Sequence, residues 1–172
     1  SVRILAGEII VVDGSSTDQT REIAKKLGAK VFKISNQPIF HINKQLAVEK
    51  ASGRWILQLD ADERLTPALT REIKAIINQP RPKFAGYYLP RKNWFLTRFL
   101  TKGGQYPDYV IRLFLNGKGY FPCESVHEQI VLDGPVGHLK QPLIHLADRN
   151  FSHYVLRFNR YTTLDADKLY RQ

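Results

Sequence analysis

The first half of the sequence alternates short apolar runs with segments of helical periodicity. The apolar runs are rich in β-branched residues and are bounded by turn-forming residues, so they predict buried strands. Strands are expected at residues 8–13, 29–34 and 54–60, and helices at about 18–27, 41–51 and 66–77. Thr66 caps the third helix and Pro67 lies in its first turn. This alternation predicts a parallel sheet covered by helices on both faces.

The second half of the sequence has a different character. Strand-like runs at 84–91, 109–115 and 129–132 are separated by Gly and Pro, and aromatic residues are frequent. This pattern predicts a mixed or antiparallel extension of the sheet, which would form a second wall of a cleft. Residues 150–171 are expected to be helical with one apolar stripe. We expect the stripe to pack against the sheet, and contact with an anionic membrane is the alternative.

Length and composition narrow the class of protein. The chain has 172 residues, which corresponds to one domain with a core of its own. Cys123 is the single cysteine, which excludes an internal disulfide and a Cys/His zinc site. No apolar run reaches the length of a membrane span. The sequence begins at Ser1 and contains no methionine, so we expect it to be part of a longer protein.

The positive charge is concentrated in one segment. The net charge is +10, and ten Lys and Arg against two acids lie between Arg71 and Lys118. Such a segment attracts phosphates, anionic lipid or nucleic acid, and a solvated basic face without a partner is the alternative.

Two carboxylates, Asp60 and Asp62, follow the third predicted strand. Ligands of parallel sheets bind beyond the carboxyl ends of strands. On an extended backbone the two side chains would point the same way and offer oxygen ligands to Mg²⁺ or Mn²⁺. The alternatives are an acidic turn before the helix and the aspartate pair of a phosphohydrolase, although no Thr/Ser or Lys motif of that chemistry follows.

Two further acids lie beside the first predicted strand. Asp13 ends the strand, where a carboxylate can accept hydrogen bonds from a base or a ribose. Asp18 is more simply explained as the N-cap of the following helix.

The segment 123–128 contains the candidates for a general base, which are Glu124, His127 and Glu128. A polar strand edge is the alternative, and adjacent His and Glu on a strand would point to opposite faces. Arg112 and the glycine-containing loop 102–108 are candidates for phosphate binding, although the loop is equally a plain turn. Trp94, Phe95 and Phe99 could stack on a sugar, touch a membrane or pack in the core.

Several segments resemble family 2 glycosyltransferases. EIIVVDGSSTDQT at 8–20 is similar to the family's "VVDxxSTDxT" segment, and RWILQLDADE at 54–63 is similar to its "GxWILxLDADE" strand. Residues 106–114, 117–119 and 126–128 resemble the subgroup of lipopolysaccharide-core β-glucosyltransferases of the WaaE type. The resemblance extends over almost the whole chain.

The resemblance implies an α/β fold of the GT-A type, a Rossmann-like mixed sheet flanked by helices. It implies a nucleotide-binding half at about 1–80, an acceptor-side half at 81–172, a nucleotide-diphospho-sugar donor, and Mg²⁺ or Mn²⁺ as cofactor. Glu128 would be the catalytic base, ahead of Glu124 and His127, and Asp62 would hold the metal together with Asp60. The remaining residues expected to bind the nucleotide sugar are Asp13, Ser15, Asp18, Lys44, Asp60 and Arg112.

Two departures from the family are visible. The family's first strand, with its "VVIPTxNE"-like turn, is absent, so the sheet would lack a strand and one wall of the base pocket would be open. Gln45 stands where an asparagine is usual.

The function expected from the sequence is inverting sugar transfer from a UDP-hexose to a cell-envelope glycan such as lipopolysaccharide core. A non-catalytic remnant that binds sugar nucleotides is the alternative, followed by a basic nucleic-acid-binding module, which the acidic clusters at the ligand edge disfavour. A cytoplasmic location is expected, with peripheral contact at the inner face of the cytoplasmic membrane left open.

Overall fold

A computed structural model of the chain describes residues 1–37, 39–124, 128–148 and 150–170. In chain order its elements are β1 (Ile10–Asp13), α1 (Thr20–Lys26), β2 (Lys30–Lys33), α2 (His41–Lys50), β3 (Trp55–Leu57), β4 (Glu63–Leu65), α3 (Pro67–Ile77), β5 (Gly86–Phe95), β6 (Arg98–Phe99), β7 (Asp108–Leu115), β8 (Gly119–Tyr120), β9 (Val131–Leu132), β10 (Val136–His138), β11 (Leu143–Asp148) and α4 (Phe151–Tyr170). The four predicted helices and the longer predicted strands are confirmed, whereas the short strands β4, β6, β8 and β10 and the six-residue β11 were not predicted.

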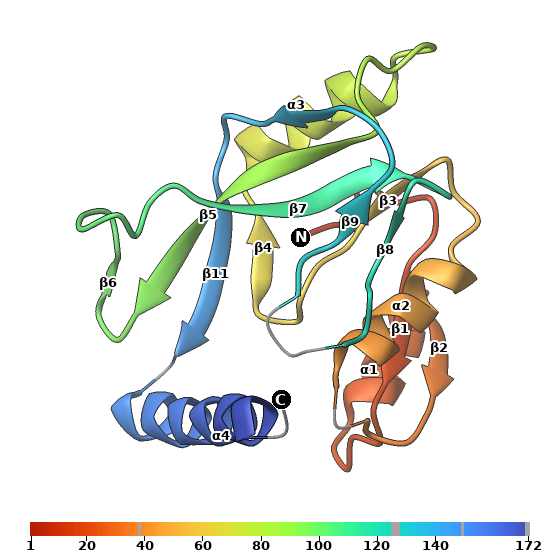
Figure 1. Ribbon diagram of the computed structural model, residues 1–172. Helices are drawn as coiled ribbons and strands as arrows, with labels where there is room; N and C mark the ends of the chain where they lie inside the picture. Colours follow the sequence, from red (N-terminus) through yellow and green to blue (C-terminus); the bar gives the residue numbers. More distant parts are fainter. Residues whose placement is uncertain (38, 125–127, 149, 171–172) are drawn as a thin grey trace.

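The larger sheet is organised around β5, its longest strand. β7 runs antiparallel to β5, and β11 and β10 run parallel to it. The strand order is β3-β7-β5-β11-β4, and β6 and β10 also pair with β5. The sheet is mixed, which confirms the prediction for the second half of the sequence. Figure 1 shows β5 and β7 crossing the centre of the molecule.

The first two strands do not join this sheet. β1 and β2 pair in parallel from Ile10 with Lys30 to Asp13 with Lys33, and they form a separate two-stranded sheet. β3 pairs antiparallel with β7. The predicted parallel sheet of three strands is therefore wrong, because no strand of the described residues pairs between β1 and β3.

Helix α3 packs against the larger sheet through one apolar face. Thr66 accepts a hydrogen bond from the backbone N–H of Leu69 at 3.1 Å, which confirms it as the N-cap. Leu69, Ile73 and Ile76 recur at helical spacing and are buried against the strands. Each buried side chain of this size contributes about 1.5–3 kcal/mol, so this face stabilises the position of the sheet edge that carries β4.

A second apolar cluster lies between α2 and the other face of the sheet. Val48 of α2 packs with Ile56 of β3 and Phe114 of β7, and Phe114 is fully buried. Phe121 and Ile130 complete the cluster. This packing fixes α2, and therefore the side chains at its N-terminal end, relative to β7.

In Figure 1, helix α4 lies beyond the ends of β5 and β11. Tyr154 contacts Phe95 edge to face, with ring centroids 5.2 Å apart. Phe151, Leu156 and Phe158 are exposed. The prediction that the apolar stripe packs against the sheet is therefore correct only for part of it. No helix in the described residues combines the length and apolarity needed to cross a membrane.

Candidate active site

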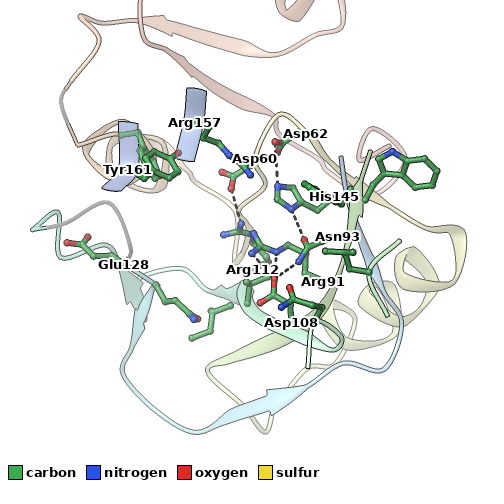
Figure 2. A pocket seen from close by; sticks show the side chains of 18 of the residues that line it. Asp60, Asp62, Arg91, Asn93, Asp108, Arg112, Glu128, His145, Arg157 and Tyr161 are labelled. Carbon is green, nitrogen blue, oxygen red and sulfur yellow. Dashed lines mark hydrogen bonds and ion pairs between the residues drawn. The ribbon is translucent and has the colours of Figure 1, made fainter. Parts of the chain in front are cut away.

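A cleft of about 1030 Å³ lies between the larger sheet, α2 and α4. Its lining comes mainly from α2, the loop before β4, the strands β5, β7 and β11, and the cleft-facing side of α4. Five of the predicted site residues line it: Lys44, Asp60, Asp62, Arg112 and Glu128. Of the strands predicted to form a second wall, β5 and β7 line the cleft, and β11 and α4, for which no such role was predicted, add to the lining (Figure 2).

Arg112 of β7 is the buried centre of an ionic network in the floor of the cleft. Its guanidinium donates to Glu63 at 2.8 Å from Nη2 and 3.0 Å from Nε, and to Gln58 at 2.6 Å from Nη1. Burial would lower the pKa of Arg112, but the charges of Glu63 and Asp60 raise it. The bidentate contact with Glu63 fixes the plane of the guanidinium.

Asp60 completes this network from the loop after β3. Nη2 of Arg112 donates to its Oδ2 at 2.9 Å, and Nζ of Lys44 lies 2.6 Å from its Oδ1. Burial would raise the pKa of Asp60, but the charges of Arg112 and Lys44 lower it to about 2. Both oxygens of Asp60 are therefore held by cations, and a metal would have to compete with two ion pairs for this carboxylate.

The expectation that Asp60 and Asp62 point the same way is wrong. The backbone forms a turn here, in which the N–H of Glu63 donates to the carbonyl of Asp60 at 3.0 Å. Figure 2 shows Asp60 directed toward Arg112, whereas Asp62 is directed toward His145. The two carboxylates thus serve two neighbouring sites.

Asp62 faces His145 of β11, a residue that the sequence did not single out. Nε2 of His145 lies 3.5 Å from Oδ2 of Asp62, and the N–H of Leu146 donates to the carbonyl of Asp62 at 2.9 Å. Hydrogen bonding from His145 lowers the pKa of Asp62 against the opposing effect of burial. An isolated histidine in an apolar run carries no sequence signal of this role.

The donor atoms of Asp62 and His145 fit a divalent cation of the Mn²⁺ type. A carboxylate oxygen suits Mg²⁺ and Mn²⁺, and an imidazole nitrogen favours the transition metals. Such cations commonly take one or two protein ligands and complete their shell with substrate phosphates. Among the described residues no group of three or more His, Cys, Asp or Glu gathers around one point, so the pair would need a diphosphate to complete the shell.

The base candidates occupy different places. Glu128 lines the cleft and has a side chain that is 9% exposed. Its carboxylate accepts backbone N–H groups of Cys123, at 2.7 Å, and of Glu124, and its Oε2 lies 3.8 Å from Nδ1 of His41. The side chain of Glu124 is exposed and does not line the cleft. His127 lies outside the described residues. In Figure 2, Glu128 lies well away from the Asp62–His145 pair.

The predicted nucleotide-binding residues near β1 do not line the cleft. Asp13 is 4% exposed and forms an ion pair with Arg21 at 2.9 Å, and hydrogen bonding to Ser16 lowers its pKa. The hydroxyl of Ser15 donates to the carbonyl of Ile34 at 2.7 Å. Asp18 accepts the N–H of Thr20 at 3.0 Å, although Gln19 is the N-cap of α1. The prediction of Asp18 as N-cap is therefore wrong by one position.

An aromatic wall closes one end of the cleft. Trp94 and Phe95 at the end of β5 and Tyr154, Phe158 and Tyr161 of α4 line it. Trp94 packs edge to face on Phe99 at 4.9 Å. Trp94, Phe95, Tyr154 and Tyr161 are partly buried at this end of the cleft, whereas Phe158 is exposed.

Comparisons with known proteins agree with this architecture. Residues 5–125 match Glycosyl transferase family 2. The chain is 30% identical over 167 residues to the lipopolysaccharide core biosynthesis glycosyltransferase LpsC of Rhizobium meliloti (strain 1021), an alignment that covers 94% of this chain and 62% of LpsC. It is 43% identical over 84 residues to an uncharacterized glycosyltransferase of Rickettsia conorii, which covers 47% of this chain and 29% of that protein. The chain thus spans less than two thirds of either relative.

The fold is also found among solved structures. The chain resembles S. aureus TarS (residues 1–349) with a TM-score of 0.57 and 18% identity, over 81% of this chain and 51% of TarS. This similarity confirms the predicted α/β fold of the GT-A type. Because the family match covers well over half of the sequence, the chain belongs to glycosyl transferase family 2.

Proposed function

We propose that the chain transfers a sugar, with inversion at the anomeric carbon, from a nucleotide-diphospho-sugar to a hydroxyl of a cell-envelope glycan. A UDP-hexose is the expected donor and lipopolysaccharide core the expected acceptor, and the similarity to LpsC, a lipopolysaccharide core biosynthesis glycosyltransferase, supports this choice of acceptor. The observation that carries the proposal is the placement of the Asp62–His145 pair beside the Lys44–Asp60–Arg112 cluster in one cleft.

The donor would bind at this end of the cleft. Lys44 lies at the mouth of the ionic network, with its ammonium 4.9 Å from the ring centroid of Phe40, and burial lowers its pKa. Asp60 would orient the ribose or diphosphate through the two cations that it holds. Asp62 and His145 would hold Mn²⁺ or Mg²⁺, which supplies positive charge to the departing diphosphate.

Glu128 is the proposed general base. Each of its oxygens accepts one backbone N–H, which orients the carboxylate within the cleft. A base on the side of the cleft away from the metal-binding pair suits inversion, because the acceptor must attack opposite the leaving diphosphate. Glu124 is the second choice, and its exposed side chain makes it the weaker one.

A non-catalytic sugar-nucleotide-binding remnant is the second candidate. It is favoured by the separation of β1–β2 from the larger sheet and by the placement of Asp13 outside the cleft. In that case the nucleotide base would lack the contacts expected from Asp13, Ser15 and Asp18, and donor affinity would be low or absent.

Calorimetric titration separates the two candidates. UDP-glucose and related nucleotide sugars are titrated into the chain and into Asp62→Asn, with and without Mn²⁺. Asp133→Asn serves as the matched control, because Asp133 pairs with Lys118 on the surface away from the cleft. Catalysis predicts Mn²⁺-dependent binding that Asp62→Asn loses and the control keeps. Absence of binding to the folded, unaltered chain would contradict the proposed function and favour the remnant.

A further inference from the structure

A row of polar side chains continues from the Asp62–His145 pair across three strands of the larger sheet. His145 pairs with Asn93 in the β11–β5 register, and Arg91 pairs with Asp108 in the β5–β7 register. Positions 91 and 93 of β5 share one face of the sheet because side chains alternate along a strand. The four side chains therefore stand side by side in the floor of the cleft, as Figure 2 shows.

Hydrogen bonds join these side chains and converge on Asp108. Arg91 donates to Oδ2 of Asp108 at 2.9 Å from Nε and 2.8 Å from Nη2, and Nδ2 of Asn93 donates to the same oxygen at 2.9 Å. Oδ1 of Asn93 lies 2.7 Å from Nδ1 of His145. An ionised carboxylate only accepts hydrogen bonds, so the NH₂ group of Asn93 must face Asp108. Its oxygen then faces the imidazole.

This orientation determines which ring nitrogen of His145 carries the proton. The amide oxygen of Asn93 only accepts, so Nδ1 must be protonated for a hydrogen bond at 2.7 Å. In a neutral imidazole Nε2 is then a lone pair, and it is directed at a carboxylate oxygen 3.5 Å away. The hydrogen bond from Nε2 to Asp62 therefore exists only in the imidazolium, and in the neutral ring the two facing acceptors can share a metal cation.

We propose that Asn93, oriented by Asp108 and Arg91, is a positioning residue that keeps the proton of His145 on Nδ1 and presents Nε2 toward Asp62. The role of Nε2 as a metal ligand rests on the proposed function, whereas the tautomer does not. Partners that hold the second nitrogen of a metal-binding histidine commonly affect metal affinity about 10–100-fold.

The tautomer is measured on the ¹⁵N-labelled chain without metal or donor. Long-range ¹H–¹⁵N spectra distinguish the protonated from the unprotonated ring nitrogen, and His145→Gln assigns the signals among the five histidines. The spectra are recorded at a pH at which the imidazole is neutral. The unaltered chain is expected to carry the proton on Nδ1. A proton on Nε2 would overturn the proposal.

Substitutions then test whether Asn93 and Asp108 determine the tautomer of His145. Asn93→Leu removes the acceptor and is expected to move the proton of His145 largely to Nε2. Asn159→Leu, on the exposed side of α4, is the matched control and should change nothing. A proton that stays on Nδ1 in folded Asn93→Leu would refute the role of Asn93. If that variant does not fold, Asp108→Asn tests the group that orients Asn93. This substitution is expected to give a mixture of the two His145 tautomers. An unchanged tautomer would show that Asp108 does not orient Asn93.

Metal binding is a separate readout. With UDP present, Asn93→Leu should bind Mn²⁺ about 10–100-fold more weakly than the unaltered chain, and Asn159→Leu should not differ from it. A chain that shows the Nδ1 tautomer but binds no Mn²⁺ with UDP would contradict the proposed function while supporting the positioning role of Asn93.

Discussion

His145 and Asp62 face each other at 3.5 Å because β11 and β4 pair antiparallel, with His145 opposite Glu63. The register brings the neighbouring Asp62 to the imidazole, and the N–H of Leu146 ties the backbone of the loop to β11 at 2.9 Å. The pair is therefore built by the sheet and does not depend on side-chain rotamers alone. Its position beside the Lys44–Asp60–Arg112 cluster gives the cleft two adjoining sites of different charge.

Removal of the imidazole tests whether this pair binds a metal. We expect His145→Gln to weaken Mn²⁺-dependent UDP binding by at least about tenfold, or about 1.4 kcal/mol, because one of two protein donors is lost. Calorimetry in the presence and absence of Mn²⁺ gives the value. His138→Gln, at an exposed position outside the cleft, is the control. Equal affinities for the two variants would exclude His145 as a ligand.

Substitutions of Glu128 and Glu124 test which of the two carboxylates acts as the general base. Glu128→Gln should keep donor binding and lower the rate of sugar transfer to a truncated lipopolysaccharide core by about 10²–10⁴-fold, the range typical of a lost general base. Glu124→Gln should leave the rate nearly unchanged, because its side chain is exposed and only its backbone N–H contacts Glu128. Similar losses in both variants would point to a structural effect of the 123–128 segment.

The buried network around Arg112 is expected to matter for folding. Arg112→Met leaves the buried Glu63 carboxylate without its main partner, and breaking a buried ion pair from one side costs about 3–5 kcal/mol. Chemical denaturation measures the change in the free energy of unfolding. Arg81→Met, on an exposed loop, should change it little. A small effect of Arg112→Met would mean that water or a rearranged side chain compensates Glu63.

The first half of the sequence predicted its helices well because their signals are local. Thr66 and Pro67 fix the start of α3, and the apolar spacing from Leu69 to Ile76 fixes its buried face. The sheet was predicted less well because pairing is not local. The sequence around β3 predicts a buried strand, but no local pattern indicates that this strand pairs with β7 and not with β1.

The site residues also divide into those with a local sequence signal and those whose role depends on strand pairing. Asp60, Asp62 and Arg112 were identified from strand ends, charge and resemblance to the family, and the structure places them in the cleft. His145 and Asn93 were not identified, because their meaning arises from the register of β11 with β4 and β5. Glu63 was also missed, since a strand of only three residues gives no pattern by which a buried acid can be told from an exposed one.

The lowered pKa of Asp60 predicts that the free energy of unfolding decreases in acid. The carboxyl titrates at about 2 in the folded chain against an ordinary value of 3.8, so the folded state favours the ionised form. The resulting stabilisation, on the order of 2 kcal/mol, is fully present above about pH 4 and is lost as the pH falls toward 2. We expect the free energy of unfolding of Asp60→Asn to depend less steeply on pH in this window. Parallel curves for the two proteins would show that Asp60 has an ordinary pKa.

The exposed apolar residues of α4 predict how the chain would bind to a membrane surface. Phe151, Phe158 and Leu169 are exposed and recur on one side of the helix, and the chain carries a net charge of +10. An apolar stripe on a basic protein favours anionic bilayers. We expect sedimentation with vesicles that contain phosphatidylglycerol, weaker binding to pure phosphatidylcholine, and weakening by salt. Phe151→Glu should reduce binding several-fold more than Ser152→Glu, which adds the same charge to the same turn of the helix. Equal effects of the two substitutions would assign the binding to charge alone and exclude insertion of the apolar stripe.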